Sequence, residues 1–220
     1  MIRRVTMKLS DNTVNILKNF STINQNILVK EGSQLRTMST MKNILGEAGI
    51  TETFPRDFGI YDLNEFLGVL SLVKDAEVEF GDSYLTVNGG KTKIRYFYSD
   101  PSILTTPPET FNAPGCDVSF KISQTTLESV LKASAVMQLP DIVIVPGKIT
   151  STDLKNVTSN NYDIDIDTLN NPEFEFNFKA DNLNKIKAGD YTFSASTEAG
   201  VSNWYGQEAN YWIAMEAKSE

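Results

Sequence analysis

The sequence predicts an α+β protein built from two similar domains. Two observations lead to this expectation. Short segments that alternate apolar and polar residues outnumber the helical patterns, and one capped helix motif occurs twice along the chain. We place the domains at residues 7–100 and 115–220. The segment 101–114 between them contains four prolines, which break both helix and strand periodicity, so it is predicted to be a linker.

The repeated helix motif begins at Lys8 and again at Lys121, an offset of 121 − 8 = 113 residues. Ser10 and Ser123 stand at matching places and are residue types that favour a helix N-cap. Apolar residues with helical spacing follow each serine, which predicts one amphipathic helix per domain. The predicted buried stripes are Val14, Leu17, Phe20 and Ile23 in the first helix, and Leu127, Val130, Leu131 and Ser134 in the second.

The remaining elements also occur in two sets. Each domain is expected to continue with a strand, a second helix that opens with an acid, and closing strands. Gly189 is expected to end the second helix of the second domain. The predicted segments are strands at 27–29 and 142–145, helices at 62–70 and 181–186, a hairpin formed by 84–87 and 94–98, and strands at 191–195 and 211–215.

The acids are concentrated on predicted strands. The chain has 20 Lys and Arg against 28 Asp and Glu, a formal net charge of −8. Residues 157–178 contain five acids and no Lys or Arg, and the acids alternate with apolar residues. A period of two places the acids on one face of each strand and the apolar side chains on the other. The outer sheet surface is therefore expected to be anionic, whereas the predicted helix faces carry Lys, Asn, Ser and Thr.

The composition excludes several classes of enzyme. The chain contains no histidine and one cysteine, Cys116, so a Ser-His-Asp triad, a His-ligated metal and an intrachain disulfide are all absent. The acids of 163–167 lack the Gly and Glu positions of a calcium loop, because Thr168 and Phe174 stand there. We therefore expect no enzyme activity and no cofactor or metal. No apolar run reaches the roughly 18 residues of a membrane span, so we expect no membrane association.

Several segments resemble one known family. The run from Tyr61 to Val73 is similar to the second helix of the sliding clamp, or DNA polymerase processivity factor, of T-even-type bacteriophages. Met7 to Ser10 resembles the usual start of that family, and Leu17 to Asn24 its first helix. Asp100 to Ser102 resembles its interdomain linker, and Glu208 to Ala217 its closing strand. Residues 1–6 precede the family's usual start, and Ala135 stands where the family can carry a second basic residue.

The resemblance implies a DNA-clamp fold and a replication function. Three subunits would close head to tail into a homotrimeric ring, with helices lining the hole and antiparallel sheets outside. Such a ring encircles duplex DNA without reading its sequence and tethers the phage replicative DNA polymerase. It is opened by a phage clamp loader, and it serves late transcription through a sigma-like factor and a coactivator. The implied location is the cytoplasm of the infected bacterial host.

The resemblance also suggests site residues. A sliding ring needs a weakly attractive lining, because many phosphate contacts would hold it in place. The expected DNA-facing lysines are Lys18, Lys132, Lys185 and Lys187, followed by Lys121, Lys179 and Lys8. An apolar pocket for partner proteins is expected near the linker and the last strand, at Ile103, Leu104, Tyr211 and Ile213. The alternative that the residues leave open is a non-enzymatic, β-rich phage structural or surface-binding protein.

Overall fold

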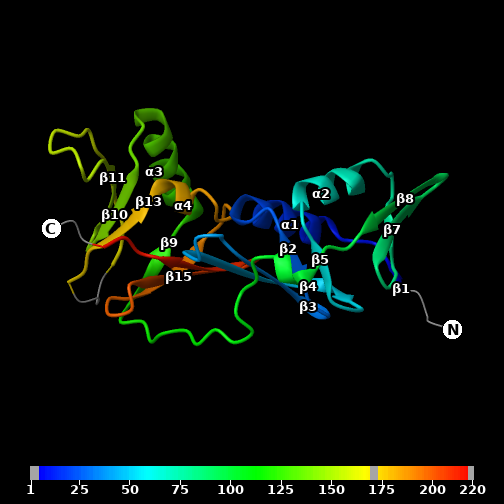
Figure 1. The fold of residues 1–220 in the computed structure, drawn as a ribbon. Coiled ribbons are helices and arrows are strands. Elements are labelled where there is room, and N and C mark those ends of the chain that lie inside the picture. The colour runs from blue at the N-terminus through cyan, green and yellow to red at the C-terminus, as the bar shows by residue number, and fades with distance from the viewer. Residues whose placement is uncertain (1–4, 169–172, 218–220) are drawn as a thin grey trace. The chain divides into compact units, whose positions relative to one another are not determined.

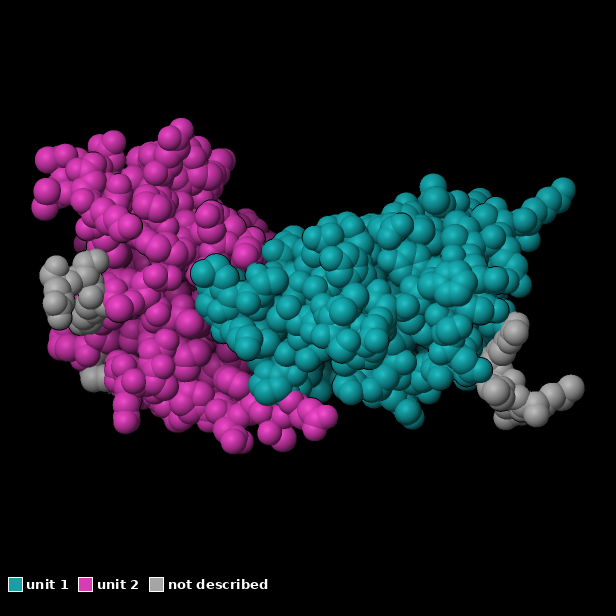
Figure 2. All heavy atoms as spheres, in the orientation of Figure 1, with its two compact units in different colours: residues 1–108 teal, residues 109–220 magenta. Residues whose placement is uncertain are grey.

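The computed structural model describes residues 5–168 and 173–217. The chain divides into two compact units, Met1–Pro108 and Glu109–Glu220, which Figure 2 shows in teal and magenta. Within the described residues each unit contains the same elements in the same order: a strand, a helix, four strands, a second helix and three strands. The predicted α+β class with two similar units is therefore confirmed. None of the helices in these residues is long and apolar enough to cross a membrane.

Unit 1 combines two helices with three sets of antiparallel strands (Figure 1). β1, β6, β7 and β8 form a sheet in that order, β2 pairs with β5, and β3 pairs with β4. The elements are β1 (Val5–Met7), α1 (Asp11–Ile23), β2 (Ile27–Val29), β3 (Gly32–Met38), β4 (Ile44–Phe54), β5 (Phe58–Ile60), α2 (Leu63–Ser71), β6 (Glu77–Phe80), β7 (Tyr84–Gly89) and β8 (Thr92–Phe97).

Unit 2 repeats this connectivity. β9, β14, β15 and β16 are neighbours in that order, and a second sheet has the order β12-β11-β10-β13. All of these pairs are antiparallel. The elements are β9 (Val118–Ile122), α3 (Gln124–Met137), β10 (Asp141–Val145), β11 (Lys148–Thr152), β12 (Tyr162–Asp165), β13 (Phe176–Lys179), α4 (Ala180–Leu183), β14 (Tyr191–Ser196), β15 (Val201–Gly206) and β16 (Asn210–Ala214).

Each unit has its own aromatic core. In unit 1, Phe54 makes an edge-to-face contact with Phe58, with ring centroids 5.4 Å apart, and Phe20 of α1 is fully buried. In unit 2, Phe193 packs edge to face on Trp204, with centroids 5.0 Å apart. Burying a large apolar side chain contributes about 1.5–3 kcal/mol, so these rings stabilise the core of each unit.

Polar caps define where the helices begin, as the sequence predicts. The Ser10 hydroxyl accepts a hydrogen bond from the Thr13 amide at 3.2 Å, and the Ser123 hydroxyl accepts one from the Thr126 amide at 3.1 Å. Asp62 caps α2 in the same way. Each cap satisfies one of the amide groups that the first turn leaves free and contributes about 1 kcal/mol.

Several details differ from expectation. In α1 the buried stripe includes Thr13 and Ile16, and Val14 is only half buried, because the stripe follows 3.6 residues per turn from Thr13. The helix expected at 181–186 is the single turn α4, which begins one residue before Asp181 and ends well before Gly189. Strands such as β3, β4 and β15 were not predicted. Residues 169–172 of the acidic segment and residues 1–4 lie outside the described residues, but Val5 and Thr6 pair with β6.

The first part of the predicted linker is packed on unit 1. A short 3-10 turn spans Pro101–Ile103, and Leu104 is buried against Gly59. A β-carbon at Gly59 would lie 2.6 Å from the Ser99 carbonyl oxygen and 2.7 Å from Leu104 Cδ1, and because the first of these is a backbone atom, only glycine allows this close approach. The Arg36 guanidinium also donates to the Pro108 carbonyl at 2.9 Å. The segment after Pro108 belongs to unit 2 and leads to Cys116, whose side chain is exposed.

Candidate nucleic-acid interface

The exposed face of α1 is polar and weakly basic. Asn15, Lys18 and Thr22 are exposed on this helix, while its other face is buried against β3 and β4. The one acid on α1 is Asp11, which lies in the first turn, where a carboxylate interacts favourably with the helix dipole. This face can therefore approach a polyanion closely with one positive charge and several neutral hydrogen-bonding groups.

A carboxylate from β4 fixes the start of α1. Glu52 accepts hydrogen bonds from the Ser10 amide and, at 2.6 Å, from the Thr13 hydroxyl. Partial burial alone would raise the pKa of Glu52, but the hydrogen bonds from Thr13 and Ser10 outweigh it and hold the pKa at about 2. The carboxylate stays charged at neutral pH and holds the helix in place on the sheet.

Helix α3 presents the corresponding face of unit 2. Thr125 and Lys132 are exposed, whereas Leu127, Val130 and Ser134 are buried. Glu128 is the acid on this helix, and its carboxylate accepts a hydrogen bond from the Gln124 side chain at 2.7 Å.

Lys18 and Lys132 occupy equivalent places in the two units. Lys18 lies seven residues after the first residue of α1, because 18 − 11 = 7, and Lys132 lies eight after the first residue of α3, because 132 − 124 = 8. Both are exposed, and neither takes part in an ion pair among the described residues. Of the seven lysines predicted from the sequence, these two are the ones that lie exposed within a helix.

Three of the remaining lysines lie close to helices but are partly engaged. Lys185 and Lys187 follow α4 and are half buried, and Lys187 forms an ion pair with Glu208. Lys8 precedes α1 and lies 2.9 Å from Asp75; this hydrogen bond raises the pKa of Lys8. Since a neighbouring acid neutralises part of the local charge, Lys187 and Lys8 attract phosphate less strongly than Lys18 or Lys132.

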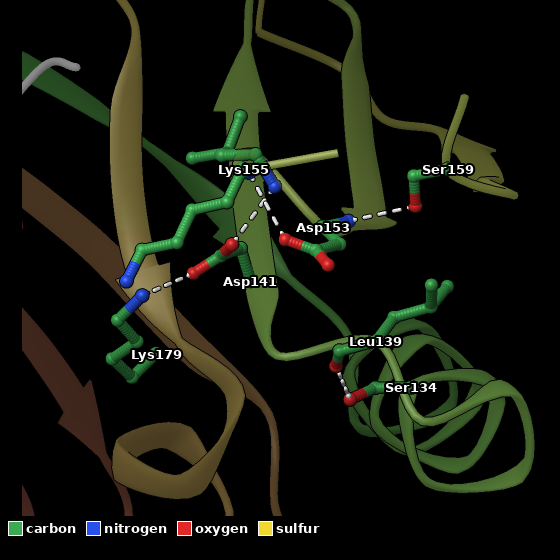
Figure 3. Close-up of polar contacts among 8 residues, drawn as sticks. Ser134, Leu139, Asp141, Asp153, Lys155, Ser159 and Lys179 are labelled. Carbon is green, nitrogen blue, oxygen red and sulfur yellow. Dashed lines mark hydrogen bonds and ion pairs between the residues drawn. The ribbon is translucent and has the colours of Figure 1, made fainter. Parts of the chain in front are cut away.

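The last two lysines lie on strands. Lys121 points outward from β9, on the face opposite the buried Phe120 and Ile122. Lys179 ends β13 and is 2.5 Å from the carboxylate of Asp141, which is 2% exposed. This hydrogen bond raises the pKa of Lys179. The Lys179 charge therefore balances a buried carboxylate and is not available as a free cation (Figure 3).

The Asp141 carboxylate also anchors the loop between β11 and β12. Its second oxygen accepts the Leu154 amide at 2.9 Å, and within the loop Ser159 accepts the Asp153 amide at 3.0 Å. Figure 3 shows Lys155 extending from this loop toward Asp141 and Lys179. Sequence reasoning missed this cluster. The only signal was an aspartate at the start of a strongly apolar strand, where a buried acid needs a partner.

Three of the four residues expected in the partner pocket are buried within their own unit. Tyr211 and Ile213 are 0% exposed, because β16 turns both side chains into the core, where Tyr211 packs edge to face on Tyr191. Leu104 is also buried, through its packing against Gly59. Ile103 is 59% exposed and is the one of the four that a partner can reach directly.

Comparison with known proteins identifies the family. Residues 8–104 match the family model described as DNA polymerase processivity factor, and residues 119–217 match the model described as gp45 sliding clamp, C terminal. The chain belongs to the sliding clamp family. It is 34% identical to the sliding clamp of Vibrio phage KVP40, over 96% of this chain and 100% of that protein. It is 32% identical to the sliding clamp of Enterobacteria phage T4, over 97% of this chain and 98% of that protein.

Solved structures share the fold at low sequence identity. PCNA from Thermococcus kodakaraensis has a TM-score of 0.70 and 13% identity, covering 97% of this chain and 99% of that one. The DNA polymerase III subunit beta from Pseudomonas aeruginosa has a TM-score of 0.71 and 12% identity, covering 99% of this chain and 66% of that one. The clamp fold expected from the phage resemblance is thus confirmed.

Proposed function

We propose that this chain is the processivity clamp of a phage replication system, which encircles duplex DNA as a homotrimeric ring and tethers the replicative DNA polymerase. Its membership of the sliding clamp family supports this assignment. The observation that carries it is the equivalence of Lys18 and Lys132, one free, exposed lysine on the first helix of each unit. Three copies of a two-unit chain would present six such helices to the DNA.

The sparse charge of these helices suits sliding. Each phosphate contact that a protein makes releases counterions and adds salt-dependent affinity, so a dense basic lining would slow movement along DNA. Helices α1 and α3 offer few cations among Asn, Ser and Thr side chains, which hydrogen-bond phosphates without reading bases. Enclosure of the DNA by the ring would keep the clamp on the DNA, and the helices would add only a weak attraction to the phosphates.

The topological mechanism predicts a specific result. Clamp loaded by the phage clamp loader onto nicked circular DNA should remain bound in high salt, and linearising that DNA should release it. Equal retention on circular and linear DNA would contradict enclosure. The matched control is linear DNA with both ends blocked by bound protein, which should retain the clamp as the circle does.

The expected partners follow from the same assignment. We propose that the polymerase, the clamp loader, the sigma-like factor of late transcription and its coactivator all bind this ring. The exposed Ile103 is the candidate apolar contact. Pull-down of each purified partner with the wild-type clamp and with Ile103→Asp tests this. Loss of binding is expected for the variant, and unchanged binding would place the pocket elsewhere.

We further propose that the protein has no catalytic activity and acts in the cytoplasm of the infected bacterium. The alternative function is that of a β-rich structural or surface-binding phage protein. No feature of the described residues in either unit favours it. A clamp should stimulate synthesis by its polymerase only when the loader and ATP are present. Stimulation that is independent of the loader would count against the ring.

A further inference from the structure

Each long helix that would face DNA also carries an acid. Helices α1, α2 and α3 contain one carboxylate side chain each, and all three are exposed: Asp11, Glu65 and Glu128. Helix α2 contains no Lys or Arg, whereas α1 and α3 contain one lysine each. A surface built only to attract phosphates would have no such acids, because phosphate contacts come from Lys and Arg.

Neutral donors hold the carboxylates of Glu65 and Glu128. The Tyr96 hydroxyl donates a hydrogen bond to Glu65 at 3.3 Å, and the Gln124 side chain donates one to Glu128 at 2.7 Å. Within the described chain, neither carboxylate forms an ion pair. A neutral donor orients a carboxylate without cancelling its charge. Both helices therefore present a positioned charge of the same sign as a phosphate.

The acids share their surfaces with the exposed lysines. Glu128 lies four residues before Lys132, so the two side chains lie on the same face of α3. In unit 1, α1 and α2 pack against each other (Figure 1). The Leu63 amide at the start of α2 donates to the Gln25 carbonyl just after α1 at 2.8 Å, and Glu65 lies in the same first turn of α2. A DNA backbone that the lysines attract to these surfaces therefore also meets carboxylates.

The amide groups at the start of α1 and α3 are engaged by the chain's own acids. A helix N-terminus binds anions readily when its amide groups are free. Here Glu52 accepts the Ser10 amide, and Asp190 accepts the Gln124 amide at 2.7 Å. These partners are 42 and 66 residues apart in the sequence. In both units, a carboxylate of the chain thus bonds an amide that would otherwise attract a DNA phosphate.

We infer that Glu65 and Glu128 lower the affinity of the clamp for DNA by repelling phosphates, and that this repulsion keeps the clamp mobile on the duplex. The inference rests on the proposed ring and concerns the regulation of its DNA-facing surface. Lys18 and Lys132 attract the duplex, while the two carboxylates prevent a phosphate from binding tightly at one place. A weak net attraction leaves a low barrier to sliding.

A purely structural role for these acids would give a different result. Glu65 lies in the first turn of α2, where a carboxylate interacts favourably with the helix dipole. If that were its whole role, Glu65→Gln would lower stability slightly and leave DNA affinity unchanged. If the carboxylate repels phosphates, the same change raises DNA affinity, which a loss of stability does not do.

Neutral variants test the repulsion. Glu65→Gln/Glu128→Gln removes two negative charges per subunit and keeps the size of both side chains. Its dissociation constant for a linear duplex of about 30 base pairs, measured by fluorescence anisotropy at about 100 mM NaCl, should fall roughly threefold or more. Glu31→Gln/Glu198→Gln is the matched control, because it removes the same charge from one exposed position in each unit outside the helices. This control should change the dissociation constant by less than about 1.5-fold.

Diffusion of loaded clamps gives an independent readout. Labelled clamps are loaded onto stretched DNA whose ends are blocked by bound protein, and their movement is followed one molecule at a time. At about 100 mM NaCl the diffusion coefficient of Glu65→Gln/Glu128→Gln should be roughly twofold or more below that of the wild type. At about 1 M NaCl the Debye length falls from about 10 Å to about 3 Å, so the difference should disappear.

The possible outcomes separate this inference from the proposed ring. A double variant that is folded by circular dichroism, and that binds and diffuses like the wild type, would overturn the inference. An equal change in the control would also overturn it, because net charge would then be the cause. If the variant altered only its loading by the clamp loader, the carboxylates would contact the loader and the inference would be wrong. Wild-type clamp that leaves circular DNA as fast as linear DNA would instead refute the ring.

Discussion

Thr13, in the first turn of α1, donates its hydroxyl hydrogen to the Glu52 carboxylate on β4 at 2.6 Å. The contact joins residues that are 39 positions apart in the sequence, and it connects the start of α1 to β4. Because Glu52 also accepts from the Ser10 amide, one side chain satisfies the cap residue and the first turn together. The position of the α1 polar face therefore depends on a carboxylate in another element.

Replacing Glu52 with Gln should destabilise the protein in a pH-dependent way. The pKa of Glu52 is about 2 in the folded chain, against an ordinary value of 4.5. A lowered folded-state pKa contributes stability above pH 4.5, and this contribution is lost as the pH falls toward 2. Urea unfolding should show a loss of about 1–3 kcal/mol for Glu52→Gln at pH 7, shrinking as the pH approaches 2. A difference independent of pH would contradict the assigned hydrogen bonds.

The equivalent lysines should contribute similarly to DNA binding. Lys18→Ala and Lys132→Ala should each reduce DNA-stimulated ATP hydrolysis by the clamp loader, and the double variant should reduce it further. The log–log slope of affinity against salt should become shallower by roughly 1 for each phosphate that the variant no longer binds. Lys30→Ala is the control, because Lys30 pairs with Asp57 and lies outside α1 and α3. If the double variant stimulated ATP hydrolysis as the wild type does, neither lysine would contribute to DNA binding.

The Asp141 and Lys179 pair should be more important for stability than a surface pair. Lys179→Ala leaves a carboxylate that is 2% exposed without its cation and should cost about 3 kcal/mol. Lys148→Ala removes a half-buried partner of the exposed Asp163 and should cost less than about 1 kcal/mol. Adding Asp141→Asn to Lys179→Ala should cost less than the sum of the single changes, because the neutral amide needs no cation. Additive losses in urea unfolding would show that the two side chains act independently.

The two isoleucines of the expected partner pocket should behave differently. Ile213→Ala removes a fully buried side chain and should lower the free energy of unfolding by about 2–4 kcal/mol. Ile103→Ala removes an exposed side chain and should change stability by less than about 0.5 kcal/mol. Thermal unfolding of both variants tests this directly. Similar losses in the two variants would contradict the assigned burial.

Local sequence patterns were sufficient to predict the capped helices, but they were not sufficient to predict every strand. Ser10, Ser123 and Asp62 each precede a helix, because their side chains satisfy amide groups only a few residues away. Strands β3 and β4 went unpredicted because their stability comes from pairing across the sheet and from burial of residues such as Leu35.

For the candidate DNA-facing lysines, the sequence predicted exposure of the side chain where that exposure follows from helix periodicity. Lys18 and Lys132 lie on polar helix faces, so their exposure could be anticipated. Lys179 could not be placed, because its partner Asp141 is 38 residues away and only the β10–β13 register brings them together. The burial of Tyr211 was not predicted for a related reason: a strand alternates between two faces, and the sequence does not say which face is covered.

The exposed Cys116 provides one accessible thiol per subunit. It is the only cysteine in the sequence, so a thiol-reactive dye would label each chain at a single position without any substitution. Partial desolvation of the thiol, together with the neighbouring Asp117, raises its pKa, so labelling should be faster in mildly alkaline buffer. Counting photobleaching steps on single DNA molecules would then report how many subunits each loaded clamp contains.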